Sequence, residues 1–234
     1  MLETLKKIYF LLLGKICGTH PRVYPWHFQW LATRDLHKIL KKELPKLSGD
    51  VLDIGCGDKP YKIWLKNAQK HIGIDIYDGA FVDYVIQPDE KWELQDNSFD
   101  AVISTQVLEH TENISHLLDE AFRVLKPKGV LIISAPFLYH EHGTPYDFWR
   151  FTKFGLEKLI KERGKIISVR EFGRIGSTLS TLFLCWIMSF HTVKIFFPFL
   201  IPLFLVVNLI GLIWDKIDFS HSYYSGVVIV AEKD

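Results

Sequence analysis

A short apolar segment that runs into two closely spaced glycines constrains the fold of this 234-residue chain most. Residues 51–54 have the composition of a buried strand, and Gly55 and Gly57 follow at once. Glycine lets the backbone adopt positive φ and approach a ligand closely, because it has no Cβ to collide. A second apolar strand, residues 71–76, contains Asp75, and an acidic side chain there accepts both hydroxyls of a ribose. The pattern predicts a nucleoside-bearing cofactor at the carboxyl edge of a parallel sheet.

The residues after Gly57 do not fit a dinucleotide. A dinucleotide fingerprint needs a third glycine, so that a helix N-terminus approaches the pyrophosphate. Here Asp58 and Lys59 follow without a third glycine, and an acidic side chain sits where two phosphates would approach. An acidic loop suits a cationic ligand instead.

With these residues the chain resembles the class I S-adenosylmethionine-dependent methyltransferases, whose first motif is a strand followed by acidic-x-Gly-x-Gly. Later landmarks of that family follow in order, namely Asp-Asn-Ser-Phe-Asp at 96–100, Gln-Val-Leu-Glu-His at 106–110 and Arg-Val-Leu-Lys-Pro-Lys-Gly at 123–129. The resemblance spans residues 50–160 and implies S-adenosylmethionine as the cofactor. The contacts it implies fall on Asp53, Gly55, Cys56, Gly57, Asp75 and Ile76, with Asp89 at the adenine and Gln106 within reach of the same region.

Charge and cysteine content exclude some other classes. The 28 basic and 27 acidic residues nearly cancel, so the balance does not suggest a nucleic-acid binder. Cys17, Cys56 and Cys185 are far apart and odd in number, which fits neither a disulfide framework nor a metal site. We therefore expect a reducing compartment, and a packing role for Cys56.

The order of apolar segments predicts the fold. Strands at 50–54, 71–76, 82–86, 100–104 and 130–134 alternate with helices near 61–68 and 113–125, which indicates a parallel sheet with right-handed crossovers. A helix at 153–163, a strand at 165–170 and a final strand at 223–231 follow, and the resemblance implies that the final strand returns antiparallel beside the fifth. The predicted fold is α/β, a doubly wound, mainly parallel seven-stranded Rossmann-like sheet with an antiparallel last strand.

An apolar stretch interrupts this pattern before the last strand. Residues 179–214 contain one formally charged residue, Lys194, with Trp186 and Trp214 near the ends. The last strand must rejoin the sheet, so both ends lie on the same side of any membrane, and 36 residues are too few for two crossings of about 20 residues each plus a turn. We expect a shallow helical membrane hairpin that turns near Pro198 and Pro202. The alternative is an apolar lid or a homodimer core.

The N-terminal segment is the second candidate for membrane contact. Residues 1–17 combine lysines with a short apolar run, which suits either an interfacial anchor or a helix that caps the core. A helix at 28–44 follows and stops at Pro45. The expected domains are N-terminal helices at 1–48, a methyltransferase domain at 49–178 and 217–234, and the helical insertion at 179–216.

The loop after the fifth strand concentrates residues that carry chemistry. Methyl transfer to a hydroxyl needs a positioned base, and histidine is the usual choice. The catalytic candidates are His140, His142 and Asp147, and the substrate-binding candidates are Tyr139, Tyr146, Trp149 and Arg150. Arg150 either clamps an anionic substrate group or pairs with Asp147 to hold the loop. The two histidines flank Glu141 without a second ligand cluster nearby, so we expect no metal.

The leading interpretation is a methyltransferase at the cytoplasmic membrane face that acts on an amphiphilic, glycan-like or lipid-linked acceptor. The loop sequence Asp-Phe-Trp-Arg-Phe-Thr at 147–152 resembles methyltransferases of cell-surface polysaccharide synthesis. A quinone acceptor is the alternative among enzymes. A membrane-tethered cofactor-binding or scaffold protein without catalysis is the alternative outside them.

Overall fold

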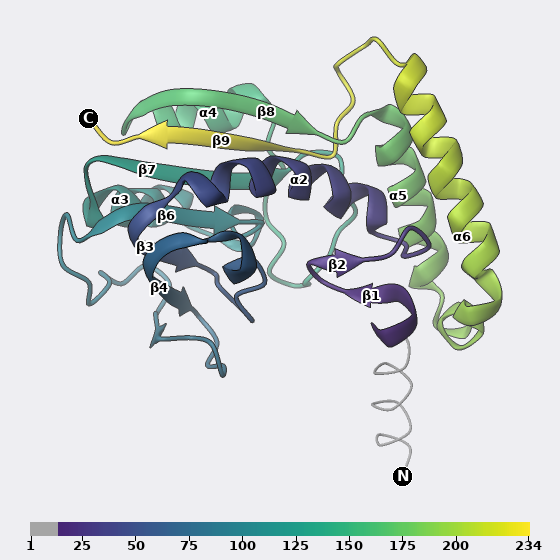
Figure 1. Ribbon diagram of the computed structural model, residues 1–234, viewed down its shortest axis with the longest axis horizontal. Helices are drawn as coiled ribbons and strands as arrows, with labels where there is room; N and C mark the ends of the chain where they lie inside the picture. The colour runs from purple at the N-terminus through teal and green to yellow at the C-terminus, as the bar shows by residue number, and fades with distance from the viewer. Residues whose placement is uncertain (1–13) are drawn as a thin grey trace. The chain divides into compact units, whose positions relative to one another are not determined.

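The structure, a computed structural model, describes residues 14–234 (Figure 1). These residues form two compact units. The sheet unit comprises residues 38–172 and 225–234, and the helical unit comprises the described residues 14–37 together with 173–224. The expected insertion, 179–216, lies within the 173–224 segment of the helical unit. Most of the predicted N-terminal anchor, residues 1–17, lies outside the described residues.

The sheet unit contains the predicted seven-stranded sheet. Its strands lie in the order β5-β4-β3-β6-β7-β9-β8, with β5 to β7 parallel and β9 antiparallel to both β7 and β8. The expected return of the last strand beside the fifth predicted strand is therefore confirmed. The bounds are β3 Ser48–Ile54, β4 Asn67–Asp75, β5 Tyr84–Val85, β6 Phe99–Thr105, β7 Leu125–Pro136, β8 Lys165–Phe172 and β9 Gly226–Glu232.

Helices cover both faces of this sheet. In the view of Figure 1, α3 (Ile114–Val124) and α4 (Lys153–Lys161) lie behind it, and residues 38–43 of α2 (Trp30–Glu43) lie in front. The central strands are consequently buried on both sides, which explains their unbroken apolar composition. Side-chain caps begin both rear helices, since Asn113 accepts from the backbone N–H of His116 and Thr152 from that of Gly155.

The prediction of a helix at 61–68 is wrong. The segment forms a single 3-10 turn, η2 (Lys62–Trp64), because β4 already begins at Asn67. Asn67 donates its side-chain amide to the carbonyl of Pro45 at 2.7 Å, which holds the strand start in place. Tyr61 and Trp64 are buried within this one turn. Their apolar spacing therefore reflects packing of a short link.

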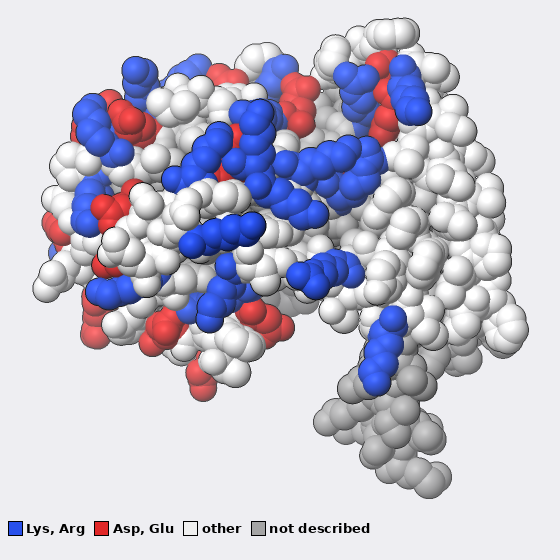
Figure 2. Space-filling view, viewed as in Figure 1, with Lys and Arg blue, Asp and Glu red and all other residues white. Residues whose placement is uncertain are grey.

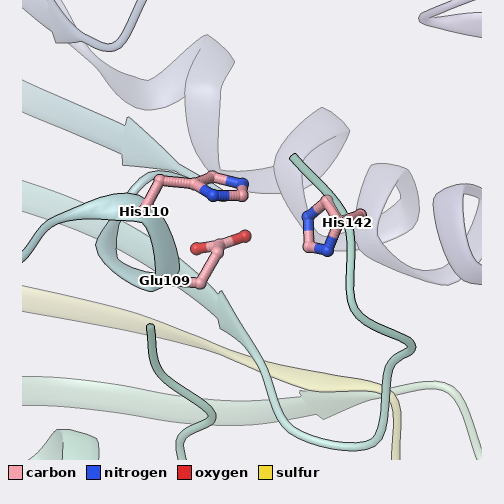
Figure 3. A group of neighbouring side chains, drawn as sticks. All are labelled: Glu109, His110 and His142. Atoms are coloured by element: carbon pink, nitrogen blue, oxygen red, sulfur yellow. The ribbon is translucent and has the colours of Figure 1, made fainter. Parts of the chain in front are cut away.

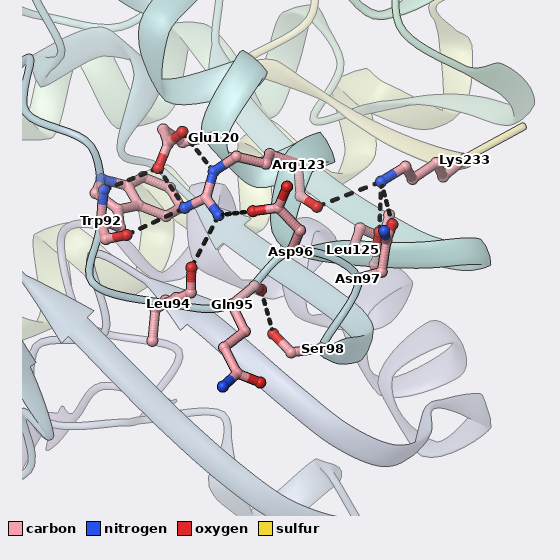
Figure 4. Close-up of polar contacts among 10 residues, drawn as sticks. All are labelled: Trp92, Leu94, Gln95, Asp96, Asn97, Ser98, Glu120, Arg123, Leu125 and Lys233. Atoms are coloured by element: carbon pink, nitrogen blue, oxygen red, sulfur yellow. Dashed lines mark hydrogen bonds and ion pairs between the residues drawn. The ribbon is translucent and has the colours of Figure 1, made fainter.

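Two of the family landmarks have a structural role in the sheet unit (Figure 4). Arg123 on α3 uses all five of its N–H donors, on the carboxylates of Glu120 and Asp96 and on the carbonyls of Trp92 and Leu94. Lys233 beside β9 donates to the carbonyl of Leu125 and the side chain of Asn97, among other acceptors. The network ties the approach to β6 to α3 and to the C-terminal strand.

The helical unit contains the predicted hairpin. It consists of α5 (Ile175–Ser189) and α6 (His191–Ile217), with residues 30–37 of α2 and the short strands β1 (Gly18–Thr19) and β2 (Arg22–Val23). The turn is misplaced in the prediction, because the break falls at Phe190 and both Pro198 and Pro202 lie inside α6. The side chain of Lys194 lies outside the described residues.

Close packing between the two helices explains the position of the turn. A Cβ on Gly176 would come within 2.3 Å of the carbonyl oxygen of Gly211, so only glycine allows this approach. Ser180 donates to the carbonyl of Val207 at 3.2 Å, which sets the same register. These contacts place the turn before both prolines. Packing of Phe197 against Phe204, with ring centroids 5.2 Å apart, spans the prolines and offsets their helix-breaking tendency.

Candidate functional site

The candidate site lies where four parallel strands end. The carboxyl ends of β3, β4, β6 and β7 meet at one edge of the sheet, and ligands of open α/β sheets bind at that edge. The segment after β3 is the glycine turn, and β4 ends at Asp75. The segment after β6 contains η3 (Leu108–His110), and β7 is followed by the loop at 137–152.

The two glycines of the turn have different functions. Both adopt positive φ, +64° at Gly55 and +47° at Gly57. A Cβ on Gly55 would come within 2.4 Å of the Val107 side chain, so this position requires glycine for packing. A Cβ on Gly57 would meet nothing within 4 Å, so the backbone there faces open space. Gly57 is therefore the position at which a ligand can approach the main chain.

Asp75 lies directly across this opening. Its carboxylate accepts the backbone N–H of Gly57 at 3.0 Å and that of Tyr77 at 3.2 Å, one on each oxygen. Each oxygen keeps a lone pair for a further donor. Ile76 beside it is 45% exposed. This arrangement suits a ribose diol next to an apolar surface for a base.

Asp53, in contrast, is 2% exposed and faces the sheet interior. Its carboxylate is 2.9 Å from Nε2 of His71 on β4. Burial raises the pKa of Asp53, and the histidine opposes that shift. The sequence analysis did not identify His71 as the partner, because pairing across adjacent strands is visible only in the fold.

Lys59 and Cys56 fix the turn to the neighbouring strand. Lys59 donates to the carbonyl of His71 at 2.9 Å and to the carboxylate of Asp83, which in turn accepts the N–H of Gly73. The Cys56 thiol is buried, and burial raises its pKa to about 12. Its surroundings match the packing role predicted for it.

Two predicted adenine contacts lie at different places. Gln106 has φ of +56° just after β6, and its side-chain amide donates to the hydroxyl of Ser134 on β7 at 3.1 Å. Asp89 is exposed, with φ of +64°, in the link between β5 and β6. Gln106 is thus part of the sheet edge, whereas Asp89 lies on a separate segment.

The loop after β7 is bound to η3 by hydrogen bonds. The carbonyl of Glu109 accepts the N–H of Phe148 at 2.7 Å, and the indole of Trp149 donates to the carbonyl of Thr111 at 3.0 Å. Nδ1 of His110 lies 2.6 Å from the carbonyl of Tyr146. The rings of Tyr146 and Trp149 remain 56% and 45% exposed.

Every donor of Arg150 is used within the loop. Two N–H groups pair with the Asp147 carboxylate at 2.6 and 2.7 Å, and the other three donate to the carbonyls of Tyr139, His140 and Trp149. The pair holds the pKa of the Asp147 carboxyl below its usual range. Of the two roles considered for Arg150, these contacts match that of holding the loop, since no donor remains for a substrate anion.

The two histidine candidates lie together with Tyr139. The Tyr139 ring centroid is 4.5 Å from that of His140 and 5.2 Å from that of His142. Burial lowers the pKa of both histidines, which keeps them neutral at pH 7. His142 is oriented by Asp147, which accepts its backbone N–H at 2.8 Å.

Glu109 is the polar residue that the sequence analysis missed. Its side chain is fully buried, and neither carboxylate oxygen has a hydrogen-bond partner among the residues described. Desolvation raises its pKa to about 8. Figure 3 shows its carboxylate directed toward the rings of His110 and His142. The signal in the sequence was its place in the Leu-Glu-His landmark, which was assigned no chemistry.

Comparison with known proteins identifies sequences similar to this chain. Residues 52–133 match the family described as "Methyltransferase domain". A "Probable S-adenosylmethionine-dependent methyltransferase" of Mycolicibacterium smegmatis is 37% identical over 98 residues, covering 37% of this chain and 38% of that protein. The ubiquinone/menaquinone biosynthesis C-methyltransferase UbiE of Rickettsia prowazekii is 28% identical over 165 residues, covering 59% and 64%. The chain spans less than two thirds of the length of either relative.

A solved structure shares the fold. Phosphoethanolamine N-methyltransferase 2 of Haemonchus contortus, in complex with S-adenosyl-L-methionine, superposes with a TM-score of 0.55 at 17% identity. The superposition covers 88% of this chain and 56% of that one.

Proposed function

The chain belongs to the class I S-adenosylmethionine-dependent methyltransferase family, and we propose that it transfers the methyl group of this cofactor to a lipid-type acceptor at a membrane surface. The open backbone at Gly57 and the carboxylate of Asp75 suit the cofactor's amino-acid and ribose parts. When bound, the cofactor supplies an electrophilic methyl group. The β6–β7 half of the sheet edge consists of η3 and the loop at 137–152. This half then positions the acceptor, because the rate of an in-line displacement depends mainly on how the two reactants are placed.

The exposed apolar faces of the hairpin are the observation that carries the proposal. On α6 the exposed side chains recur at helical spacing as Phe199, Leu203, Val206, Ile210, Ile213 and Ile217, and on α5 as Leu179, Phe183 and Trp186. Figure 2 shows α6 white along most of its length. A continuous apolar stripe of this size is unusual on the surface of a soluble monomer and fits insertion among acyl chains.

The lengths of the helices favour shallow insertion. Residues 197–217 are long and apolar enough to cross a bilayer, with a mean hydropathy of 2.3. The 15 residues of α5 reach only about 22 Å, short of the ~30 Å hydrocarbon core. The backbone N–H of Ser225 donates to the carbonyl of Phe172 at 2.9 Å, so the insertion leaves and re-enters the sheet at one point. A hairpin inserted into a single leaflet fits both the short length of α5 and the start and end of the insertion at the same point of the sheet.

Charges at the end of the hairpin favour a headgroup level. A pocket of about 540 Å³ there is lined by the apolar residues Leu209, Leu212 and Ile213 together with Arg34, Arg174, Asp215 and Lys216. One terminal nitrogen of Arg34 is buried without a hydrogen-bond partner among the described residues. Basic groups beside apolar ones suit an anionic lipid headgroup. The three free, buried cysteines fit a reducing compartment, which supports the cytoplasmic face.

A quinone-type acceptor is the second candidate. The UbiE protein of Rickettsia prowazekii, similar over 165 residues, is named for C-methylation in ubiquinone and menaquinone biosynthesis. Such a substrate is both lipid-soluble and aromatic, which would suit the exposed hairpin and the aromatic loop at 137–152. The relatives lend no support to the glycan-like acceptor considered from the sequence.

Vesicle flotation tests the membrane part of the proposal. Purified protein should float with vesicles of anionic phospholipid, and a Phe199→Ser/Val206→Ser/Ile210→Ser variant should lose vesicle affinity by about tenfold or more. The reason is that each large apolar side chain contributes ~1.5–3 kcal/mol when fully buried. Phe154→Ser is the matched control, because Phe154 is 69% exposed but lies on α4 of the sheet unit.

Calorimetry with S-adenosylhomocysteine in the same variants separates this question from cofactor binding. Both variants should bind it with wild-type affinity. A full-length protein that stays monodisperse without detergent and does not float would contradict the membrane site. The apolar stripe would then be a lid or a dimer surface. Failure to bind S-adenosylhomocysteine would instead favour the scaffold alternative.

A further inference from the structure

Glu109 is a fully buried residue of the sheet unit whose carboxyl oxygens have no hydrogen-bond partner among the described residues. A buried carboxyl without a hydrogen-bond partner is costly in either protonation state. Arg150, the cation whose charge reaches it, already spends all five donors elsewhere and is neutralised by Asp147. The Glu109 carboxylate can therefore bind a cation, and no side chain in the described part of the chain supplies one.

The two neighbouring histidines are oriented as ligands. Nδ1 of His110 lies 2.6 Å from the carbonyl of Tyr146, and a carbonyl only accepts, so Nδ1 carries the proton. Nδ1 of His142 lies 3.2 Å from the carbonyl of His140 and 3.4 Å from the carboxylate of Asp147, with the same consequence. Nε2 of neither ring has a hydrogen-bond partner among the described residues, so this nitrogen can bind an ion. Metal-binding histidines are held by this kind of outer hydrogen bond.

The spacing of the three groups completes the argument. One ligand atom from each of Glu109, His110 and His142 lies within 4.8 Å of the other two, and the three side chains converge (Figure 3). We propose that these residues bind a divalent transition-metal ion through one carboxylate and two imidazoles. This donor set suits Zn²⁺, Fe²⁺ or Co²⁺ better than Mg²⁺ or Ca²⁺, which prefer oxygen.

The site is held by residues of both segments that form the β6–β7 half. Glu109 and His110 belong to η3, and His142 belongs to the loop at 137–152. A Cβ on Gly143 would come within 3.0 Å of the His110 ring, so glycine there lets the loop approach η3. The ion would join the two segments, in addition to the hydrogen bonds that already link them.

The ion also defines an acceptor class. Three protein ligands leave coordination positions open, and oxygen atoms of a substrate fill such positions. Resting on the proposed function, this implies a lipid-type acceptor whose head carries adjacent oxygens, as a catechol does. The ion would place the head group at the end of β6, beside the loop at 137–152.

Metal binding is tested directly with Co²⁺ and full-length protein that carries no histidine tag. Titration should give one Co²⁺ per chain with a visible absorption band, and Zn²⁺ should displace it. Glu109→Gln and His142→Gln should each weaken binding by about a hundredfold or more. His116→Gln is the control, because this histidine contacts the carbonyl of Glu90 away from the cluster. Wild-type affinity for S-adenosylhomocysteine in each variant shows that the fold is intact.

Three outcomes are informative. Substoichiometric Co²⁺, or equal binding by wild type and both ligand variants, overturns the metal site. Catechol added to the Co²⁺ protein should shift the absorption band, and an unchanged band overturns the acceptor class while leaving the ion. Because no methyl transfer or vesicle is involved, failure here differs from failure of the proposed function.

Discussion

The two halves of the sheet edge differ in how far their contacts reach along the chain. In the β3–β4 half, Gly57 meets Asp75 and Asp53 meets His71, each pair 18 residues apart. In the β6–β7 half, His110 meets Tyr146 and Thr111 meets Trp149, at separations of 36 and 38. The first half is built from contacts between two adjacent strands and the turn that follows β3. The second depends on a long loop that folds back onto η3, so a change within that loop is expected to leave the contacts of the first half intact.

The largest expected effect breaks the loop of the β6–β7 half. Arg150→Ala should lower the free energy of unfolding by about 3 kcal/mol, because it removes both guanidinium hydrogen bonds from the Asp147 carboxylate, whose side chain is 2% exposed and which would keep only its contacts with His142. Urea unfolding measures the change. Arg150→Lys should recover only part of it, since a lysine cannot reproduce the bidentate pair.

Lys161→Ala is the control for that measurement. Its partner Glu157 forms an exposed pair one helical turn away on α4, and such pairs contribute about 0.5 kcal/mol or less. At a temperature where the Arg150→Ala variant is folded, its affinity for S-adenosylhomocysteine should equal that of the wild type. A stability loss below about 1 kcal/mol would return Arg150 to the list of substrate-binding candidates.

The same contrast explains what the sequence could predict. The strands, and the place of Gly57 and Asp75 at one edge of the sheet, follow from local patterns, namely apolar runs that end in glycine or an acidic residue. The Glu109–His142 cluster does not, because the partners lie 33 positions apart and meet only when the loop folds back onto η3. The expectation of no metal rested on the sequence neighbours of His140 and His142, and it stays a prediction that the Co²⁺ titration tests.

Local propensity also misled in two places where packing decides. Pro198 and Pro202 predicted the hairpin turn, yet helix–helix contact at Gly176 and Gly211 sets the register and moves the break to Phe190. The apolar spacing after Pro60 predicted a helix, yet the start of β4 at Asn67 leaves room for one turn. Neither constraint is visible from the residues within the segment.

A moderate effect is expected in the β3–β4 half. Asp75→Ala should weaken S-adenosylhomocysteine binding by roughly tenfold or more, since each hydrogen bond to a charged acceptor contributes ~1.5–3 kcal/mol. Calorimetry on folded protein measures it. Co²⁺ binding should stay at the wild-type level, because the two halves share no ligand. Unchanged cofactor affinity would remove Asp75 from the site, and a parallel loss of Co²⁺ binding would show that the halves are not separable.

The smallest expected effect concerns Cys56, which lies between two glycines of the cofactor turn. Its thiol is 2% exposed and its pKa is raised to about 12, so almost no reactive thiolate forms at pH 8. Iodoacetamide at that pH should leave Cys56 unmodified in native protein and should leave S-adenosylhomocysteine affinity unchanged, whereas in urea Cys17, Cys56 and Cys185 should all be alkylated. Peptide mass spectrometry reads out each site separately. Rapid native alkylation of Cys56 that S-adenosylhomocysteine prevents would mean that the thiol lines the ligand space. The Cys56 side chain would then be a ligand contact of the β3–β4 half, and not a buried packing residue.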